Sequence, residues 1–156
     1  MRVRRATAAD ADAIRALALA VQQLHVAARP DIFVDGGAET RETLLERLAN
    51  PSYRFWVVED GAAVAGYLCA RVADEAAFAL KHAQRVVHLD EMGVAPEHRG
   101  RGVGRLLVDA LGEAARESGA ARIVVNVWSF NDGAVRFYER AGFAPFAQRM
   151  ALELDG

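Results

Sequence analysis

Cysteine and histidine are scarce in this chain, and their scarcity limits the chemistry available to it. Cys69 is the single cysteine among 156 residues, so neither an internal disulfide nor a zinc site built from several thiolates can form. It lies in an apolar stretch without a neighbouring histidine or acid, so we expect a small core residue rather than a nucleophile. The four histidines have no metal-ligand spacing, and we predict no bound metal.

An excess of charge of one sign and a long hydrophobic run are also missing. Lysine and arginine number 19 against 21 aspartate and glutamate, which gives a formal net charge of -2 and disfavours a broad nucleic-acid-binding surface. No apolar run is long enough to cross a bilayer, and the basic start at residues 1–5 lacks the apolar stretch of a signal peptide. We therefore predict a cytoplasmic protein that binds neither nucleic acid nor membranes.

Internal repeats are absent, and no linker rich in proline, glycine or serine divides the sequence. A chain of 156 residues buries roughly 68–70% of its unfolded surface, and its 53% of hydrophobic residues are enough to build one core. We therefore predict a single domain over residues 1–156.

What the sequence does contain is a regular succession of helical and strand patterns. Apolar residues spaced by three and four positions predict amphipathic helices behind Thr7 and over residues 39–49, 103–118 and 132–141. Alternating or continuously apolar stretches bounded by turn residues predict strands over residues 3–5, 54–59, 62–72, 85–94, 122–127 and 148–154. This order predicts a mixed α/β structure with helices packed on one central sheet.

Glycine and arginine are concentrated between the predicted strand 85–94 and the predicted helix 103–118. This glycine turn contains Arg99, Gly100, Arg101, Gly102, Gly104 and Arg105. Glycines let backbone N–H groups approach a common point, and a helix start adds unpaired N–H donors that attract phosphate. The spacing is not the dinucleotide fingerprint, because Arg105 stands at the third glycine position, and a phosphate loop would require a lysine. From this stretch alone, a turn with solvated arginines is an equal alternative.

Two motifs together resemble one known family. The stretch Arg99-Gly100-Arg101-Gly102-Val103-Gly104 is similar to R/Q-x-x-G-x-G/A, the pyrophosphate-binding motif of the GNAT superfamily of acyl-CoA N-acyltransferases. Downstream, Asn131, Ala134, Phe137, Tyr138, Gly142 and Phe143 match that family's N-x-x-A-x-x-F-Y-x-x-x-G-F run. The order of predicted elements resembles the family over essentially the whole chain.

The resemblance implies a fold and a co-substrate. The expected fold is a mostly antiparallel sheet, splayed between the fourth and fifth strands, with helices on both faces. Acetyl-CoA would lie along the exposed strand edge, with an amide near Met92 facing the thioester carbonyl and the turn's N–H groups holding the pyrophosphate. The implied acetyl-CoA-binding residues are Met92, Gly93, Val94, Arg99, Gly100, Arg101, Gly102, Val103, Gly104, Arg105, Asn131, Ala134, Phe137 and Tyr138. Asn131 has an additional interpretation as an ordinary helix N-cap.

The resemblance also implies direct transfer of the acetyl group to a primary amine, with no acyl-enzyme. Tyr138 matches the family tyrosine that protonates the departing thiolate, and core packing on its helix is the alternative. For the general base we rank Asp90 first and His88 second, although the family has glutamate at the matching positions. Strict alternation places Glu91 on the opposite face, and a β-bulge would bring Glu91 forward instead. An ordinary polar strand residue is the alternative for each.

Residues 25–40 correspond to the family's acceptor wall, where His25, Asp31 and Phe33 are the candidate substrate-binding residues. Acids in this segment, including Asp31, Asp35 and Glu39, would attract a cationic amine, unless they are simply solvated. We predict a small-molecule amine as the acceptor, with a protein or peptide N-terminus as an alternative and a homodimer left open. The rival functions are a non-catalytic acyl-CoA-binding or sensing domain and an arginine-mediated nucleic-acid module, which the net charge disfavours.

Overall fold

The computed structural model describes residues 1–36, 39–77 and 79–154. Its contacts divide the chain into two compact units, Met1–Asn126 and Val127–Gly156, and each unit is described by itself. The single domain that the sequence predicts for residues 1–156 stays a prediction.

The first unit is built on a five-stranded sheet whose strand order follows the chain. The strands are β1 (Arg2–Arg5), β2 (Tyr53–Asp60), β3 (Ala63–Glu75), β4 (Gln84–Val94) and β5 (Arg122–Val125). β1 to β4 pair antiparallel, and β5 joins β4 in parallel. The hairpin between β2 and β3 turns at Gly61, whose φ of 63° lies in the left-handed region that glycine tolerates. The mixed sheet confirms the predicted fold class.

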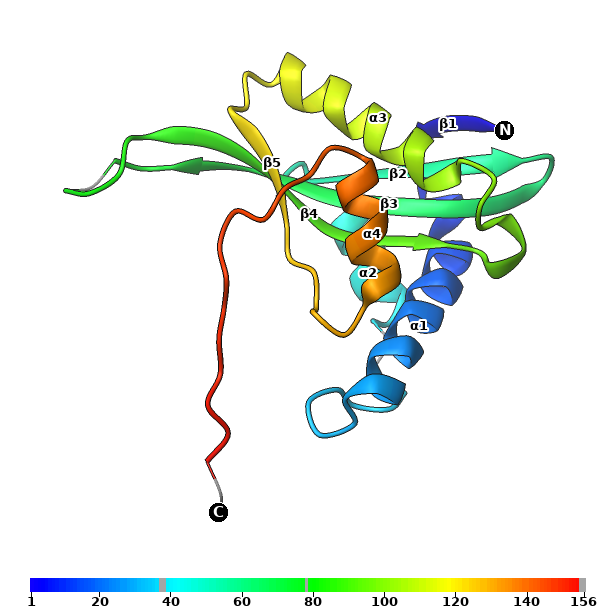
Figure 1. The fold of residues 1–156 in the computed structure, drawn as a ribbon. Helices are drawn as coiled ribbons and strands as arrows, with labels where there is room; N and C mark the ends of the chain where they lie inside the picture. Colours follow the sequence, from blue (N-terminus) through cyan, green and yellow to red (C-terminus); the bar gives the residue numbers. More distant parts are fainter. Residues whose placement is uncertain (37–38, 78, 155–156) are drawn as a thin grey trace. The chain divides into compact units, whose positions relative to one another are not determined.

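Helices cover both faces of this sheet. α1 (Ala11–Ala28) and α2 (Arg41–Ala49) lie on one face, and α3 (Val103–Glu117) lies on the other (Figure 1). Two glycines, one on β3 and one on β4, show which helix lies closest to each face of the sheet. A Cβ added at Gly93 would meet Val21 of α1 at 3.3 Å, whereas a Cβ added at Gly66 would meet Val103 of α3 at 2.7 Å. A side chain at Gly66 would collide with α3, and one at Gly93 would collide first with the Tyr67 ring, 2.8 Å away, on the side of α1.

The core under α1 and α2 joins helical and strand residues whose periodicities point them to one another. Its buried members are Ala11, Ile14, Leu44, Phe55, Val57, Tyr67 and Cys69. Phe55 and Val57, like Tyr67 and Cys69, are two residues apart on their strands, so each pair faces the same side. Cys69 has an exposed fraction of 0%, which confirms its interpretation as a core residue.

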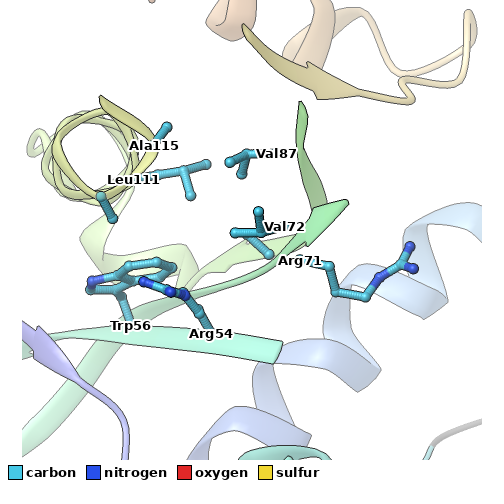
Figure 2. A pocket seen from close by; sticks show the side chains of 9 residues that line it. Arg54, Trp56, Arg71, Val72, Val87, Leu111 and Ala115 are labelled. Carbon is cyan, nitrogen blue, oxygen red and sulfur yellow. The ribbon is translucent and has the colours of Figure 1, made fainter. Parts of the chain in front are cut away.

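The opposite face of the sheet is closed by α3. Figure 2 shows Leu111 and Ala115 of α3 directed toward Trp56, Val72 and Val87 of the sheet. The cavity left between them measures about 10 Å³, no more than about one water molecule needs. This interface is therefore packed core, and it offers no room for a substrate.

The second unit contains α4 (Asp132–Arg140) followed by a stretch without regular structure. The predicted strand over residues 148–154 is wrong, because the described residues 143–154 form no strand. Alternating apolar residues make a strand only when a neighbouring strand accepts their hydrogen bonds, and Met150, Leu152 and Leu154 are at least 84% exposed. Among the described residues of both units, no helix has the length and apolar character needed to span a membrane.

Candidate functional site

The second half of β4 is paired on one side only. Its register with β3 runs from Gln84 to Val94, but its register with β5 covers only Val86 to Leu89. In the described part of the chain, the β4 residues from Asp90 onward therefore have no strand on the β5 side. Main-chain groups along such an edge can pair with an extended ligand. The parting of the fourth and fifth strands agrees with the expected fold.

The glycine turn connects this edge to α3. A short helix, η2 (Pro96–His98), is followed by Gly100 with φ 71° and Gly102 with φ 87°, both in the left-handed region. Apart from its chain neighbours, no atom lies within 4 Å of a Cβ built on either glycine, so their outer side is open. α3 begins at Val103, and the N–H groups of its first turn have no acceptor within the helix. The turn therefore presents unpaired donors and the positive end of the helix dipole.

The arginines of the turn make only exposed contacts. Arg101 lies 3.1 Å from the carboxylate of Asp60, and Arg105 lies 2.9 Å from that of Asp109. Arg99 contacts no carboxylate among the residues that the structure describes. The side chains of Arg101 and Arg105 are 49% and 59% exposed, and ion pairs this exposed contribute about 0–1 kcal/mol. A diphosphate can therefore replace these carboxylates at little cost.

A histidine holds the turn from its inner side. His98 has an exposed fraction of 9%, and its Nε2 lies 3.3 Å from Asp60 at the end of β2. Its Nδ1 has no hydrogen-bond partner in the described part of the chain. Asp60 contacts both His98 and Arg101, and so ties the turn to the β2–β3 hairpin.

A β-bulge in β4 determines which acids face α1 and α2. Cys69 pairs with Glu91 and Ala70 pairs with Leu89, so Asp90 is an extra residue in β4. Glu91 therefore lies on the same face as Cys69, which belongs to the core under α1 and α2. Strict alternation, which predicts Glu91 on the face opposite Asp90, is wrong here. The bulge is the alternative that the sequence left open.

Glu91 is held by two donors from different elements. A terminal nitrogen of Arg47, on α2, donates to its Oε1 at 2.8 Å, and the hydroxyl of Tyr67 donates to its Oε2 at 3.2 Å. Burial is the largest single influence and opposes the charged form of Arg47, but the charges of Glu91 and Glu39 and the hydrogen bond to Glu91 together outweigh it, so the pKa of Arg47 lies above its usual value. Burial raises the pKa of Tyr67, and the charge of Glu91 adds to this, so the hydroxyl stays a donor. The other terminal nitrogen of Arg47 binds Glu39 at 2.9 Å.

Asp90 and His88, the first-ranked bases, have other partners. Asp90 accepts two hydrogen bonds from Arg71, at 2.6 and 2.8 Å. Figure 2 shows the Arg71 side chain extending away from Leu111 and the α3 side of the sheet. Nε2 of His88 lies 3.8 Å from a carboxylate oxygen of Glu75. The structure thus places Asp90 beside Glu91 but gives each acid an arginine of its own.

Three residues of this cluster, Arg47, Tyr67 and Arg71, were not identified from the sequence. A signal for Arg47 exists, because it stands three residues after Leu44 and therefore lies toward the apolar face of its helix. Tyr67 alternates with buried Cys69, and a buried tyrosine hydroxyl usually has a hydrogen-bond partner. Neither signal says which acid is the partner.

The candidate substrate-binding residues of segment 25–40 differ in how far neighbouring side chains already engage them. The rings of His25 and Phe33 stack with centroids 4.9 Å apart. Asp31 is bound by Arg29 at 2.8 and 2.6 Å, so its charge is already balanced. Residues 37–38 of this segment lie outside the described residues. Of the acids expected to attract an amine, Glu39 belongs instead to the Arg47 contacts.

The second unit positions the downstream motif. The side chain of Asn131 accepts from the N–H of Ala134 at 3.1 Å, which confirms its N-cap interpretation. Tyr138 makes edge contacts with the rings of Phe137 and Phe143, whose centroids lie 5.2 and 5.3 Å away. Burial raises the pKa of Tyr138 to about 12, so the phenol stays protonated at neutral pH. Among the described residues of the whole chain, no three His, Cys, Asp or Glu side chains are placed to hold a metal ion.

The comparison with protein families agrees with this arrangement. Residues 18–143 match the Acetyltransferase (GNAT) family. The chain belongs to this family. The match includes β4, the glycine turn, α3 and α4, which carry the two motifs that the sequence shares with GNAT proteins.

Individual GNAT proteins resemble the chain over different lengths. Streptothricin acetyltransferase of Streptomyces lavendulae is 41% identical over 56 residues, which are 36% of this chain and 30% of that protein. The chain thus matches less than a third of that relative's length. A solved structure of the BH1408 protein tetramutant from Bacillus halodurans is 24% identical with a TM-score of 0.94, covering 99% of this chain and 100% of that one. An aminoglycoside N-acetyltransferase, AAC(6')-Iy in complex with CoA, is 16% identical with a TM-score of 0.71, covering 99% and 100%.

Proposed function

We propose that this GNAT protein transfers the acetyl group of acetyl-CoA to a primary amine of a small molecule. The observation that carries this proposal is the unpaired edge of β4 beyond Leu89, which leads directly into an open glycine turn at a helix start. An extended, diphosphate-containing ligand needs both parts, and the chain supplies them in sequence. The CoA bound to AAC(6')-Iy and the acetyltransferase name of the streptothricin relative support the same co-substrate and reaction.

Each part of acetyl-CoA has a matching part of the first unit. Main-chain groups of Met92, Gly93 and Val94 lie on the unpaired edge and would pair with the pantetheine amides. N–H groups from Gly102 to Arg105 would hold the pyrophosphate. The N–H near Met92 would stabilise the negative charge on the thioester oxygen during attack by the amine.

We assign the base role to Glu91 in preference to Asp90. If Glu91 takes up a proton, Arg47 still has Glu39 as a counter-ion. If Asp90 takes up a proton, its arginine keeps no carboxylate partner in the described part of the chain. Because Arg71 is exposed, losing this ion pair costs only about 0–1 kcal/mol, and the difference favours proton uptake at Glu91 by that small amount.

The proposed reaction balances without further reactants. The amine nitrogen forms a bond to the acetyl carbon as the carbon–sulfur bond breaks, Glu91 accepts the proton of the amine, and the thiolate takes up a proton from a general acid, the role that the family resemblance gives to Tyr138. For a lysine-like amine with a pKa of about 10.4, deprotonation at pH 7 costs roughly 4–5 kcal/mol, so a base matters. For an α-amine of pKa about 7.7–8.0 the cost is only about 1 kcal/mol.

The decisive experiment measures free thiol released from acetyl-CoA by the purified protein in the presence of a panel of amines. The panel contains small diamines, aminoglycosides and a peptide with a free N-terminus, and mass spectrometry identifies the acetylated product. We expect a small cationic amine to give the highest turnover. Turnover on the peptide alone would show that the acceptor is a peptide N-terminus and not a small-molecule amine. No turnover on any amine would reject the enzyme assignment.

A non-catalytic acyl-CoA-binding domain is the second candidate. One observation favours it, because both β4 acids are engaged by arginines, Glu91 by Arg47 and Asp90 by Arg71. This candidate expects acetyl-CoA binding without amine-dependent thiol release, so the same assay separates the two functions.

A further inference from the structure

The guanidinium of Arg47 joins two carboxylates that are far apart in the sequence. One terminal nitrogen binds Glu39 at 2.9 Å, and the other binds Glu91 at 2.8 Å. We propose that Glu39 sets the proton affinity of Glu91 through this shared guanidinium, and is therefore a positioning residue for the reaction. The inference rests on the proposed function for the role of Glu91 as base.

Both ends of this link are fixed by other contacts. The main-chain carbonyl of Glu39 accepts from Nε of Arg15, on α1, at 3.0 Å. The Arg47 guanidinium lies over the rings of Tyr53 and Phe55, at 4.9 and 5.2 Å from their centroids. The side chains of Arg47 and Glu39 are only 19% and 23% exposed, so solvent screens their interaction less than it screens a surface pair.

The charged and titratable groups around Glu91 leave Glu39 as the one that shares its cation. From β3, Tyr67 donates to Glu91, and the buried Cys69 thiol, whose pKa is raised to about 12 by burial, stays neutral. On β4 itself, the charge of Asp90 is balanced by Arg71.

The charged groups of α1 are engaged elsewhere. Arg15 binds a main-chain carbonyl, Asp12 pairs with Arg41 at 3.2 Å, and the His25 ring stacks on Phe33. A change of charge at Glu39 therefore reaches Glu91 through Arg47.

Two substitutions have opposite expected effects. Glu39→Gln leaves Arg47 with Glu91 as its single anion, so the Glu91 carboxylate is stabilised and takes up a proton only at lower pH. Arg47→Gln removes the cation and leaves two carboxylates near one another, so Glu91 takes up a proton at higher pH. A purely structural role for either residue would not produce shifts of opposite sign.

The test combines NMR with kinetics on the full chain. The side-chain carboxyl carbon of Glu91, assigned by its disappearance in Glu91→Gln, is titrated by ¹³C NMR in the wild type and in each variant. We expect the midpoint to fall by about 0.5–1 pH unit in Glu39→Gln and to rise by a similar amount in Arg47→Gln. The acidic limb of the kcat/KM profile should move in the same directions, and Glu39→Gln should lower the plateau several-fold because a weaker base remains.

Glu46→Gln is the matched control, since Glu46 is an exposed acid adjacent to Arg47 on α2 with no ion pair among the described residues. It should leave both the titration and the kinetics unchanged. Arg47→Lys keeps the charge and should restore most of the wild-type midpoint if Arg47→Gln folds poorly.

The outcomes separate this inference from the proposed function. An unchanged Glu91 midpoint in Glu39→Gln overturns the coupling, whatever the activity of the wild type. Shifted midpoints in a protein without acetyl transfer would uphold the coupling and reject the enzyme assignment instead.

Discussion

Whether a carboxylate on β4 can act as a base depends on which partner remains for its arginine once the carboxylate has taken up a proton. Arg47 keeps Glu39, whereas Arg71 is left with the ring of Tyr53, 5.8 Å from its guanidinium carbon. The extra residue in β4 also matters, because it places both acids on the α1 and α2 side. The choice between Glu91 and Asp90 is therefore open to direct test.

Replacing each acid by its amide should give unequal losses. We expect Glu91→Gln to lower kcat about 100-fold with a lysine-like amine, in the range of general-base contributions. Asp90→Asn should lower kcat less than about 5-fold. This substitution removes only an ion pair with an exposed arginine and leaves the proton acceptor, Glu91, in place. Steady-state kinetics on both variants decides the order, and a larger loss in Asp90→Asn would return the base role to Asp90.

The pKa of Tyr138 predicts how the reaction depends on alkaline pH. With a pKa raised to about 12 by burial, the phenol stays protonated up to about pH 11, so it causes no loss of rate between pH 7 and pH 10. Tyr138→Phe should lower kcat about 10- to 100-fold and leave acetyl-CoA affinity within 2-fold, as measured by calorimetry. If Tyr138→Phe and the wild type had equal kcat values throughout this pH range, Tyr138 would have no part in the mechanism.

At the scale of elements, local patterns predict most positions well. The helix predicted over residues 103–118 is α3 at Val103–Glu117, because its apolar spacing and its flanking glycines are contained in the segment itself. The β4 bulge is different, since it exists only in the register between β3 and β4. Likewise, the two carboxylate partners of Arg47 come from β4 and from the segment before α2, and Glu91 of β4 is brought to α2 only by the tertiary fold.

The glycines at the two ends of α3 provide a matched test of the turn. Gly102 and Gly119 both have a positive φ, 87° and 72°, and a Cβ on either meets nothing within 4 Å. Glutamate at either position strains the backbone similarly, but the two sites are separated by about 22 Å of helix. Gly102→Glu should abolish acetyl-CoA binding, whereas Gly119→Glu should retain it. Equal affinity in both variants, measured by calorimetry, would remove the turn from the binding site.

The junction between β1 and α1 depends on one buried acid. Hydrogen bonds from Arg4, at 2.8 and 2.7 Å, outweigh desolvation and lower the pKa of Asp10 to about 2. Its stabilising effect is therefore complete above about pH 4 and is lost as the pH falls toward 2. Asp10→Asn should lower the free energy of unfolding by about 1–2 kcal/mol at pH 7 and by less at pH 3, as measured by urea denaturation. Asp12→Asn, at a side chain that is 73% exposed, should change it by less than about 0.5 kcal/mol at either pH.

At the scale of the whole molecule, the sequence identifies the family more firmly than the last part of the architecture. The two motifs lie within residues 18–143, where the family match also lies, together with the elements from the middle of α1 to α4. The failed strand over residues 148–154 lies beyond that range, in a segment whose apolar residues are exposed. Its periodicity is real, but a strand is a property of two paired segments, and one segment alone does not contain that information.

Binding of acetyl-CoA should be visible in the thermal stability of the whole chain. A ligand at 100 times its Kd stabilises the folded state by about 2.7 kcal/mol, which for a chain of this size raises Tm by roughly 5–10 °C. We expect this shift with both acetyl-CoA and CoA, and its loss in Gly102→Glu but not in Gly119→Glu, as monitored by calorimetry. A shift without amine-dependent thiol release would favour the sensing domain over the enzyme. The absence of any shift at millimolar acetyl-CoA would contradict both, because each requires the edge of β4 and the glycine turn to hold the ligand.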